Sequence, residues 1–116
     1  MTDAKKIKKI RKQISANLED GQNTGAVNKL LKLHPADQAE VFLLLSTEEQ
    51  NQLLEYLDIP ATADLFDELE DQETLEVAEN LSLERLADVL DEMDPDEAAD
   101  LLGDLPPDTA EEALAQ

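Results

Sequence analysis

Three aspartates near the end of the sequence have the residue type and the spacing of a cation-binding ridge. Asp96, Asp100 and Asp104 follow one another at intervals of four residues, so a helix would place them along one side. Carboxylate oxygens are the ligands that Mg²⁺ prefers, and one or two carboxylates with retained waters suffice to hold it. The ridge therefore has the chemistry of a weak cation site, although a solvated helix face remains the simpler interpretation of any single acidic residue.

Two other kinds of site are not supported by these residues. An EF-hand calcium loop that began at Asp94 and Asp96 would need a third ligand and a glycine, but Ala98 and Ala99 occupy those positions. The chain has no cysteine and a single histidine, so it offers no thiolate metal site and no recognisable nucleophile and base. We expect no enzyme activity, and we expect His34, which precedes a proline, to cap a helix.

The charge is divided unevenly along the chain. Residues 1–32 hold eight basic and three acidic residues, a net charge of +5, whereas residues 33–116 hold one basic and 26 acidic residues, a net charge of −25. The acidic part repels nucleic acid and attracts cations. No apolar run reaches the roughly 18 residues of a membrane span, and the start of the chain lacks the apolar core of a signal peptide. We therefore expect the isolated chain to be soluble and cytoplasmic, with divalent cations and not nucleic acids as partners.

A twelve-residue repeat organises most of the chain and would position the acidic residues. Each copy has an apolar pair followed by a third apolar residue at i, i+1 and i+4, which form one stripe on a helix. The stripes predict an all-α fold, because an isolated stripe must pack against its neighbours. The repeated positions are Val41, Phe42 and Leu45; Leu53, Leu54 and Leu57; Leu65, Phe66 and Leu69; Val77, Ala78 and Leu81; Val89, Leu90 and Met93; and Leu101, Leu102 and Leu105.

Turn residues recur in the same frame. Ser46, Ser82 and Asp94 directly follow a stripe, and serine and aspartate are good N-caps. Helices of about eight to ten residues joined by turns of two to four are therefore expected. Such short repeats stack as an α-solenoid, and we predict that residues 23–116 form a right-handed superhelix of short helices.

The first 22 residues differ from the repeat. Ile7, Ile10, Ile14 and Leu18 predict one amphipathic helix at about residues 4–19 with a basic outer face, followed by a linker at residues 21–25. Residues 1–22 are thus interpreted as a separate N-terminal helix with its linker. This helix could cap the open end of the superhelix or lie against its acidic surface, or its lysines could meet anionic lipid.

The sequence resembles a known family over roughly residues 23–116. The stretches HPADQAE at residues 34–40 and MDPDEAADLLGDLP at residues 93–106 are similar to the N-terminal cytosolic domain of MgtE-type magnesium transporters. The resemblance implies a homodimeric protein at the plasma membrane. In that family the helical domain precedes a pair of CBS domains, a linking helix and a membrane pore.

What the resemblance implies for this segment is magnesium sensing and not transport. In the family, acidic residues of the helical domain and the CBS domains share Mg²⁺ ions, and the bound ions close the channel. By position, the corresponding ligands are Asp96, Asp100 and Asp64, with Glu97 as an assisting neighbour. Because the CBS domain would supply the other ligands, we expect the isolated domain to bind Mg²⁺ weakly, in the millimolar range.

A second hypothesis comes from a different functional class. Arrays of short helices also occur in flagellar motor switch proteins, where the related domains bind protein partners and have no specific ion site. Such a scaffold would present charged ridges of both signs, but Arg85 is the one basic residue after residue 32. The sequence therefore favours the magnesium sensor.

Overall fold

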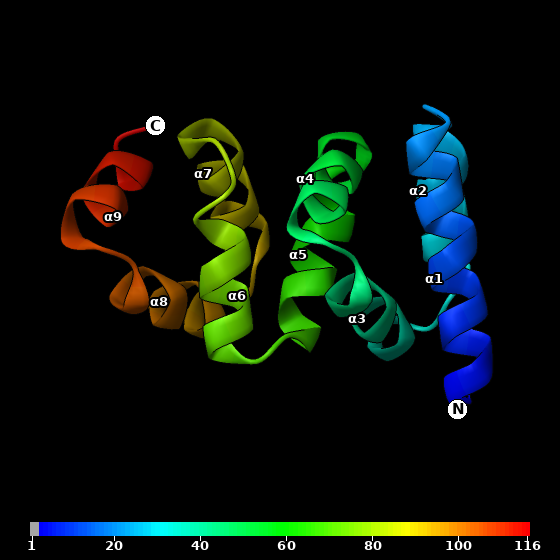
Figure 1. Ribbon diagram of the computed structural model, residues 1–116. Coiled ribbons are helices and arrows are strands. Elements are labelled where there is room, and N and C mark those ends of the chain that lie inside the picture. Colours follow the sequence, from blue (N-terminus) through cyan, green and yellow to red (C-terminus); the bar gives the residue numbers. More distant parts are fainter. Residues whose placement is uncertain (1–2) are drawn as a thin grey trace. The chain divides into compact units, whose positions relative to one another are not determined.

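The computed structural model describes residues 3–116, and over that range it contains nine α-helices and no strand (Figure 1). This confirms the all-α prediction. The chain divides between Asp58 and Ile59 into two compact units, unit 1 up to Asp58 and unit 2 from Ile59. The division at residues 22 and 23 and the right-handed superhelix remain predictions. The helices of unit 1 are α1 (Ala4–Glu19), α2 (Asn23–Leu31), α3 (Pro35–Leu44) and α4 (Thr47–Tyr56); those of unit 2 are α5 (Ile59–Glu68), α6 (Asp71–Ala78), α7 (Leu83–Glu92), α8 (Pro95–Asp104) and α9 (Pro107–Leu114).

The twelve-residue frame sets where each helix begins. From α2 to α9, every helix starts twelve residues after the one before it, and each has eight to ten residues, as predicted. His34 accepts a hydrogen bond at Nδ1 from the backbone N–H of Ala36 at 3.2 Å, which confirms its capping role. Ser46 and Glu49 form the reciprocal capping box at the start of α4, satisfying two backbone donors that the helix leaves free.

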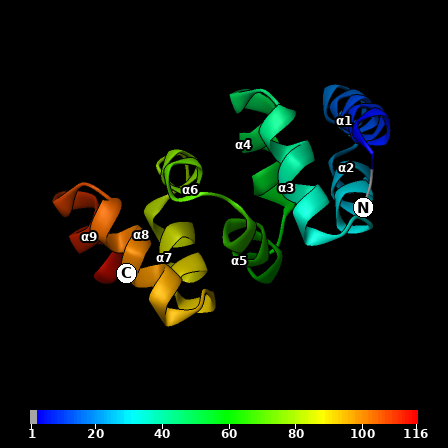
Figure 2. The ribbon, with the colours of Figure 1, turned by 90° about the horizontal axis from the view of Figure 1, so that it is seen from below.

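The apolar stripes form the core of each unit. In unit 1, α1 packs against α3 and α2 packs against α4; in unit 2, α5 packs against α7, α6 against α8 and α7 against α9. Figure 2 shows α1 and α2 beside α3 and α4 within unit 1. Phe42, Leu53 and Leu65 are fully buried. On α9, Ala113 is buried but Leu114 is 71% exposed, so the apolar side of this last helix is only partly covered.

Polar side chains that are buried or half-buried join consecutive helices. Gln50 donates from Nε2 to the carbonyl of Phe42 at 2.9 Å, and the Thr74 hydroxyl lies 3.5 Å from the carbonyl of Phe66. In both cases the acceptor lies near the end of the preceding helix, where carbonyls lack a partner within the helix. Gln50 and Thr74 both occupy the position three residues before the apolar pair of their repeat. A polar side chain at this position hydrogen-bonds to the preceding helix.

The N-terminal helix has the predicted bounds, but the predicted linker at residues 21–25 is wrong. Gly21, with a φ of 76°, ends α1, and the N–H of Gln22 donates to the carbonyl of Asn17 at 2.7 Å in the pattern of a Schellman motif. Helix α2 begins at Asn23, so residues 23–25 are helical. A Cβ on Gly25 would lie 2.9 Å from Nδ2 of Asn17, so this glycine serves the close approach of α1 and α2 and not chain flexibility.

Opposite effects on stability are expected for alanine at two of the glycines. Gly21→Ala should lower the free energy of unfolding by about 1 kcal/mol, because the left-handed conformation at Gly21 brings an added Cβ too close to the backbone. Gly103→Ala should raise it by about 0.5–1 kcal/mol, because alanine is the better helix former and nothing lies within 4 Å of its Cβ. Urea denaturation followed by circular dichroism measures both changes, and equal signs for the two variants would contradict the structural assignment.

Candidate functional site

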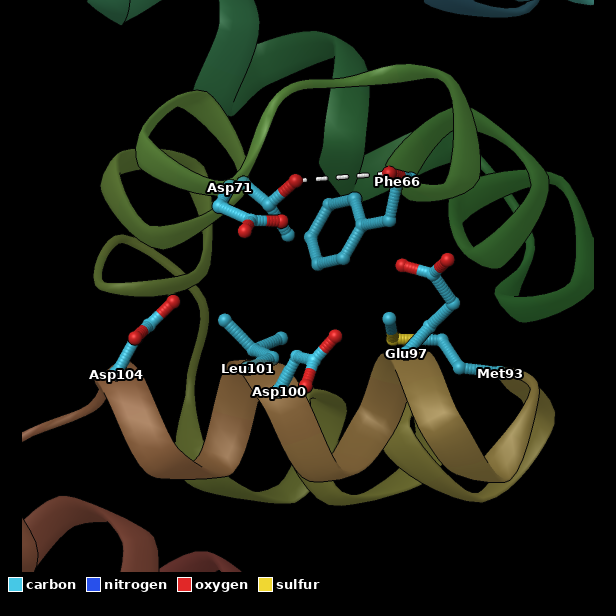
Figure 3. A pocket seen from close by; sticks show the side chains of 8 residues that line it. Phe66, Asp71, Met93, Glu97, Asp100, Leu101 and Asp104 are labelled. Carbon is cyan, nitrogen blue, oxygen red and sulfur yellow. Dashed lines mark hydrogen bonds between the residues drawn. The ribbon is translucent and has the colours of Figure 1, made fainter.

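A pocket in unit 2 places acidic side chains around an apolar floor (Figure 3). It lies between α6 and α8, which pack against each other. Phe66, near the C-terminal end of α5, also lines it. Phe66, Met93 and Leu101 form the floor, and all three are buried. The other lining residues are polar: Asp71 and Thr74 from α6, and Glu97, Asp100 and Asp104 from α8.

The acidic residues of α8 share one face because of their spacing. Glu97, Asp100 and Asp104 are separated by three and four residues, the spacing of side chains that line one side of a helix. In Figure 3 they point to the side where Phe66 and Asp71 lie. All four carboxylates are exposed, so water can reach the rim of the pocket. We name the four residues Asp71, Glu97, Asp100 and Asp104 the acidic rim.

The structure separates the four predicted ligands. Glu97 and Asp100 belong to the acidic rim, whereas Asp96 and Asp64 do not line the pocket. Asp96 lies in the first turn of α8. Each step of four residues turns the helix about 40° past a full turn, so the ridge through Asp96, Asp100 and Asp104 drifts across the edge of the pocket. The metal-binding role of the four predicted residues remains a prediction.

Two residues of the acidic rim were missed by the sequence reasoning. Asp104 was part of the acidic ridge but had no counterpart among the ligands that the family resemblance implied. Asp71 lies in the first turn of α6, and no local pattern connects it with residues 97–104. Asp71 and the acidic residues of α8 come together because α6 packs against α8, the next helix but one. Two repeats span 24 residues, so comparing positions 24 residues apart could have indicated this contact.

Asp64 belongs to a second acidic group in unit 2. Burial raises the pKa of Asp67, and the negative charges of Asp94, Asp64 and Glu68 raise it further. Asp64 and Asp67 lie on α5, while Asp94 is the N-cap of α8. The charge of Asp64 therefore acts on Asp67, and Asp64 does not line the pocket.

Replacing Asp67 by asparagine is expected to stabilise the protein at neutral pH. Because the pKa of Asp67 is raised in the folded protein, its ionised form costs stability above that pKa, and the cost disappears as the pH falls through it. The gain in Asp67→Asn should be less than about 1 kcal/mol, since water screens exposed charges, and should vanish near pH 3. Thermal unfolding at pH 7 and pH 3 measures this, with Asp108→Asn on α9 as control; equal gains at both pH values would contradict it.

The acidic rim does not by itself form a metal site in the part of the chain that the structure describes. Within residues 3–116, no three histidine, cysteine, aspartate or glutamate side chains are arranged so that they could hold a metal ion. The rim carboxylates can attract a hydrated cation, because Mg²⁺ retains several waters when few protein ligands are present. A tighter site would need oxygen ligands from a second surface.

Comparison with known proteins places the chain in a family. The sequence model of the family described as the MgtE intracellular N domain matches residues 33–116, which is more than half of the chain. The chain therefore belongs to the MgtE intracellular N domain family. No match was found among curated proteins.

The fold is also similar to a solved structure. The crystal structure of the soluble part of a magnesium transporter matches with a TM-score of 0.84 and 26% sequence identity. The match covers 94% of this chain and 43% of the solved one, so this chain spans less than half the length of that protein. In the part of the chain that the structure describes, no helix has both the length and the apolar character to cross a membrane.

Proposed function

We propose that this chain is the cytosolic magnesium-sensing domain of a magnesium transporter. The proposal is supported by membership of the MgtE intracellular N domain family and by the similarity to the soluble part of a magnesium transporter. The transporter's membrane domain and a CBS domain are the expected partners, within a homodimer at the cytoplasmic side of the plasma membrane. The domain regulates ion passage and performs no catalysis.

The observation that carries the sensing role is the acidic face of α8 in unit 2. Glu97 and Asp100 lie in the acidic rim, Asp96 lies beside them on the same helix, and Asp64 lies on α5. Unit 2 holds 20 acidic residues and one basic residue, a net charge of −19. An acidic CBS surface would be repelled by such a field at low Mg²⁺.

Rising Mg²⁺ reduces the repulsion between unit 2 and the CBS surface, because each bound ion is coordinated by carboxylates of both. Carboxylates of α8 supply part of the coordination sphere and the CBS domain supplies the rest, so each ion binds the docked state better than the separated one. A ligand shifts an equilibrium by its difference in affinity for the two states. The domain therefore docks and closes the channel when intracellular Mg²⁺ is high, and it separates when Mg²⁺ is low.

Ion flux through the transporter that carries this domain tests the proposal. The double substitution Glu97→Gln and Asp100→Asn should leave Mg²⁺ entry active at internal Mg²⁺ concentrations that close the unmodified protein. Asp108→Asn with Glu111→Gln is the matched control, since both residues are exposed on α9 and the charge changes equally. Normal closure in the Glu97 and Asp100 variant would contradict the proposal and favour an ion-independent scaffold.

A further inference from the structure

The outer face of α1 is a compact basic surface that the fold of unit 1 does not use. Ile7, Ile14 and Leu18 are buried against the rest of the unit, which turns the lysines outward. Along the helix, the lysines span about two turns, or roughly 10 Å. We name this surface the α1 lysine face; its members, all exposed, are Lys5, Lys8, Lys9 and Lys12.

The lysines of this face have no partner within residues 3–116. None of their side chains makes a hydrogen bond or an ion pair in that range. Arg11, on the side of α1 that meets α4, behaves differently. Burial alone would raise the pKa of Glu49 on α4, but the neighbouring Ser15 and Ser46 and the charge of Arg11 lower it overall. The fold therefore gives Arg11 an internal role and leaves the lysines free.

The surroundings of the α1 lysine face do not cancel its charge. Unit 1 holds eight basic and nine acidic residues up to Asp58, so its net charge is −1 and its positive charge is concentrated on α1. Asp3, the N-cap of α1, offsets part of the charge beside Lys5. Glu19 and Asp20 lie at the opposite end of the helix, about 10 Å along the axis from Lys12, which is beyond the Debye length at physiological ionic strength. In Figures 1 and 2, α1 lies at an edge of unit 1.

We propose that the α1 lysine face docks onto the surface of an anionic lipid bilayer. This inference rests on the proposed function, because a domain carried by a membrane transporter is held close to a bilayer. Clusters of four or more basic residues on one helix are attracted to anionic lipid headgroups. The apolar side of α1 is buried, so the helix cannot insert; it lies on the headgroups through charge alone.

A flat anionic surface fits this face better than other polyanions do. The face is one stripe of a single helix, and it carries no aromatic residue that could stack on a base. Unit 2, with a net charge of −19 and Arg85 as its one basic residue, offers no second basic surface along which an extended nucleic acid could bind. A second copy of this chain would bring that same acidic charge, but its net charge of −20 opposes association of whole chains.

Sedimentation of the 116-residue chain with lipid vesicles tests the proposal without any metal. The chain should bind vesicles that contain phosphatidylserine and not vesicles of phosphatidylcholine alone, and raising the salt concentration should weaken binding. The triple substitution Lys5→Gln, Lys9→Gln and Lys12→Gln should reduce the partition coefficient by at least about tenfold. Circular dichroism confirms that the variant is folded.

A charge-matched control separates the face from the net charge. Asn28→Asp, Ala36→Glu and Thr47→Glu lower the net charge by the same amount at exposed positions of α2, α3 and α4, and this variant should bind like the unmodified chain. Equal binding to both kinds of vesicle, or an unaffected lysine variant, overturns the proposal. So does lipid-free self-association that the lysine substitutions abolish, because the face would then serve a second copy. Since no Mg²⁺ is present, each of these three outcomes leaves the proposed sensing function standing.

Discussion

Phe66→Ala is expected to lower the free energy of unfolding by about 3–5 kcal/mol. The Phe66 side chain is 2% exposed and forms part of the pocket floor together with Met93 and Leu101. Its loss removes a large apolar contact and leaves a cavity below the acidic rim. Because domains of this size are stable by about 5–15 kcal/mol, unit 2 should be largely destabilised.

Urea denaturation followed by circular dichroism measures this effect. Tyr56→Ala on α4 is the control, because Tyr56 is also aromatic but is 52% exposed and should cost no more than about 1 kcal/mol. Similar denaturation midpoints for the two variants would show that the repeat frame does not define the core.

Magnesium is expected to stabilise the isolated chain by about 1.4 kcal/mol at a concentration ten times its dissociation constant. With millimolar affinity, this corresponds to a rise of several degrees in the unfolding temperature. The physical reason is that unit 2 carries a net charge of −19, and a bound divalent cation offsets part of the self-repulsion. Glu97→Gln with Asp100→Asn should remove most of the gain.

The control for this prediction is sodium chloride at the same ionic strength. General screening acts on all exposed charges, so it raises the unfolding temperature to some extent without a site. An identical rise with NaCl and MgCl₂ would show that the acidic residues of α8 only form a solvated surface.

The helices and the core were predictable because both follow from one short repeat. The stripe at Leu53, Leu54 and Leu57, for example, fixes a buried face by local spacing alone, and the residue after each stripe fixes the helix start. Most copies of the repeat have an acidic residue just before the apolar pair, but residue 52 is glutamine. The Gln52 amide donates to the carbonyl of Leu18 at 2.8 Å and to Oδ1 of Asn23 at 2.7 Å. An ionised carboxylate could not donate these hydrogen bonds.

The errors arose where one segment meets another that is distant in the sequence. Gly25 looked like a linker residue, but it lies in α2, where the absence of a side chain lets α1 approach closely at Asn17. Asp71 joined the acidic rim because α6 packs against α8, which the composition of α6 does not reveal. Local spacing placed Glu97 and Asp100 on α8, but it could not show that Asp64 on α5 would lie outside the pocket.

Amide NMR of the isolated chain during a Mg²⁺ titration tests the magnesium-sensing account most directly. The account predicts shifts concentrated at Asp96, Glu97 and Asp100 on α8 and at Asp64 on α5, saturating in the millimolar range. Shifts spread evenly over all the acidic residues, without saturation at these positions, would contradict it.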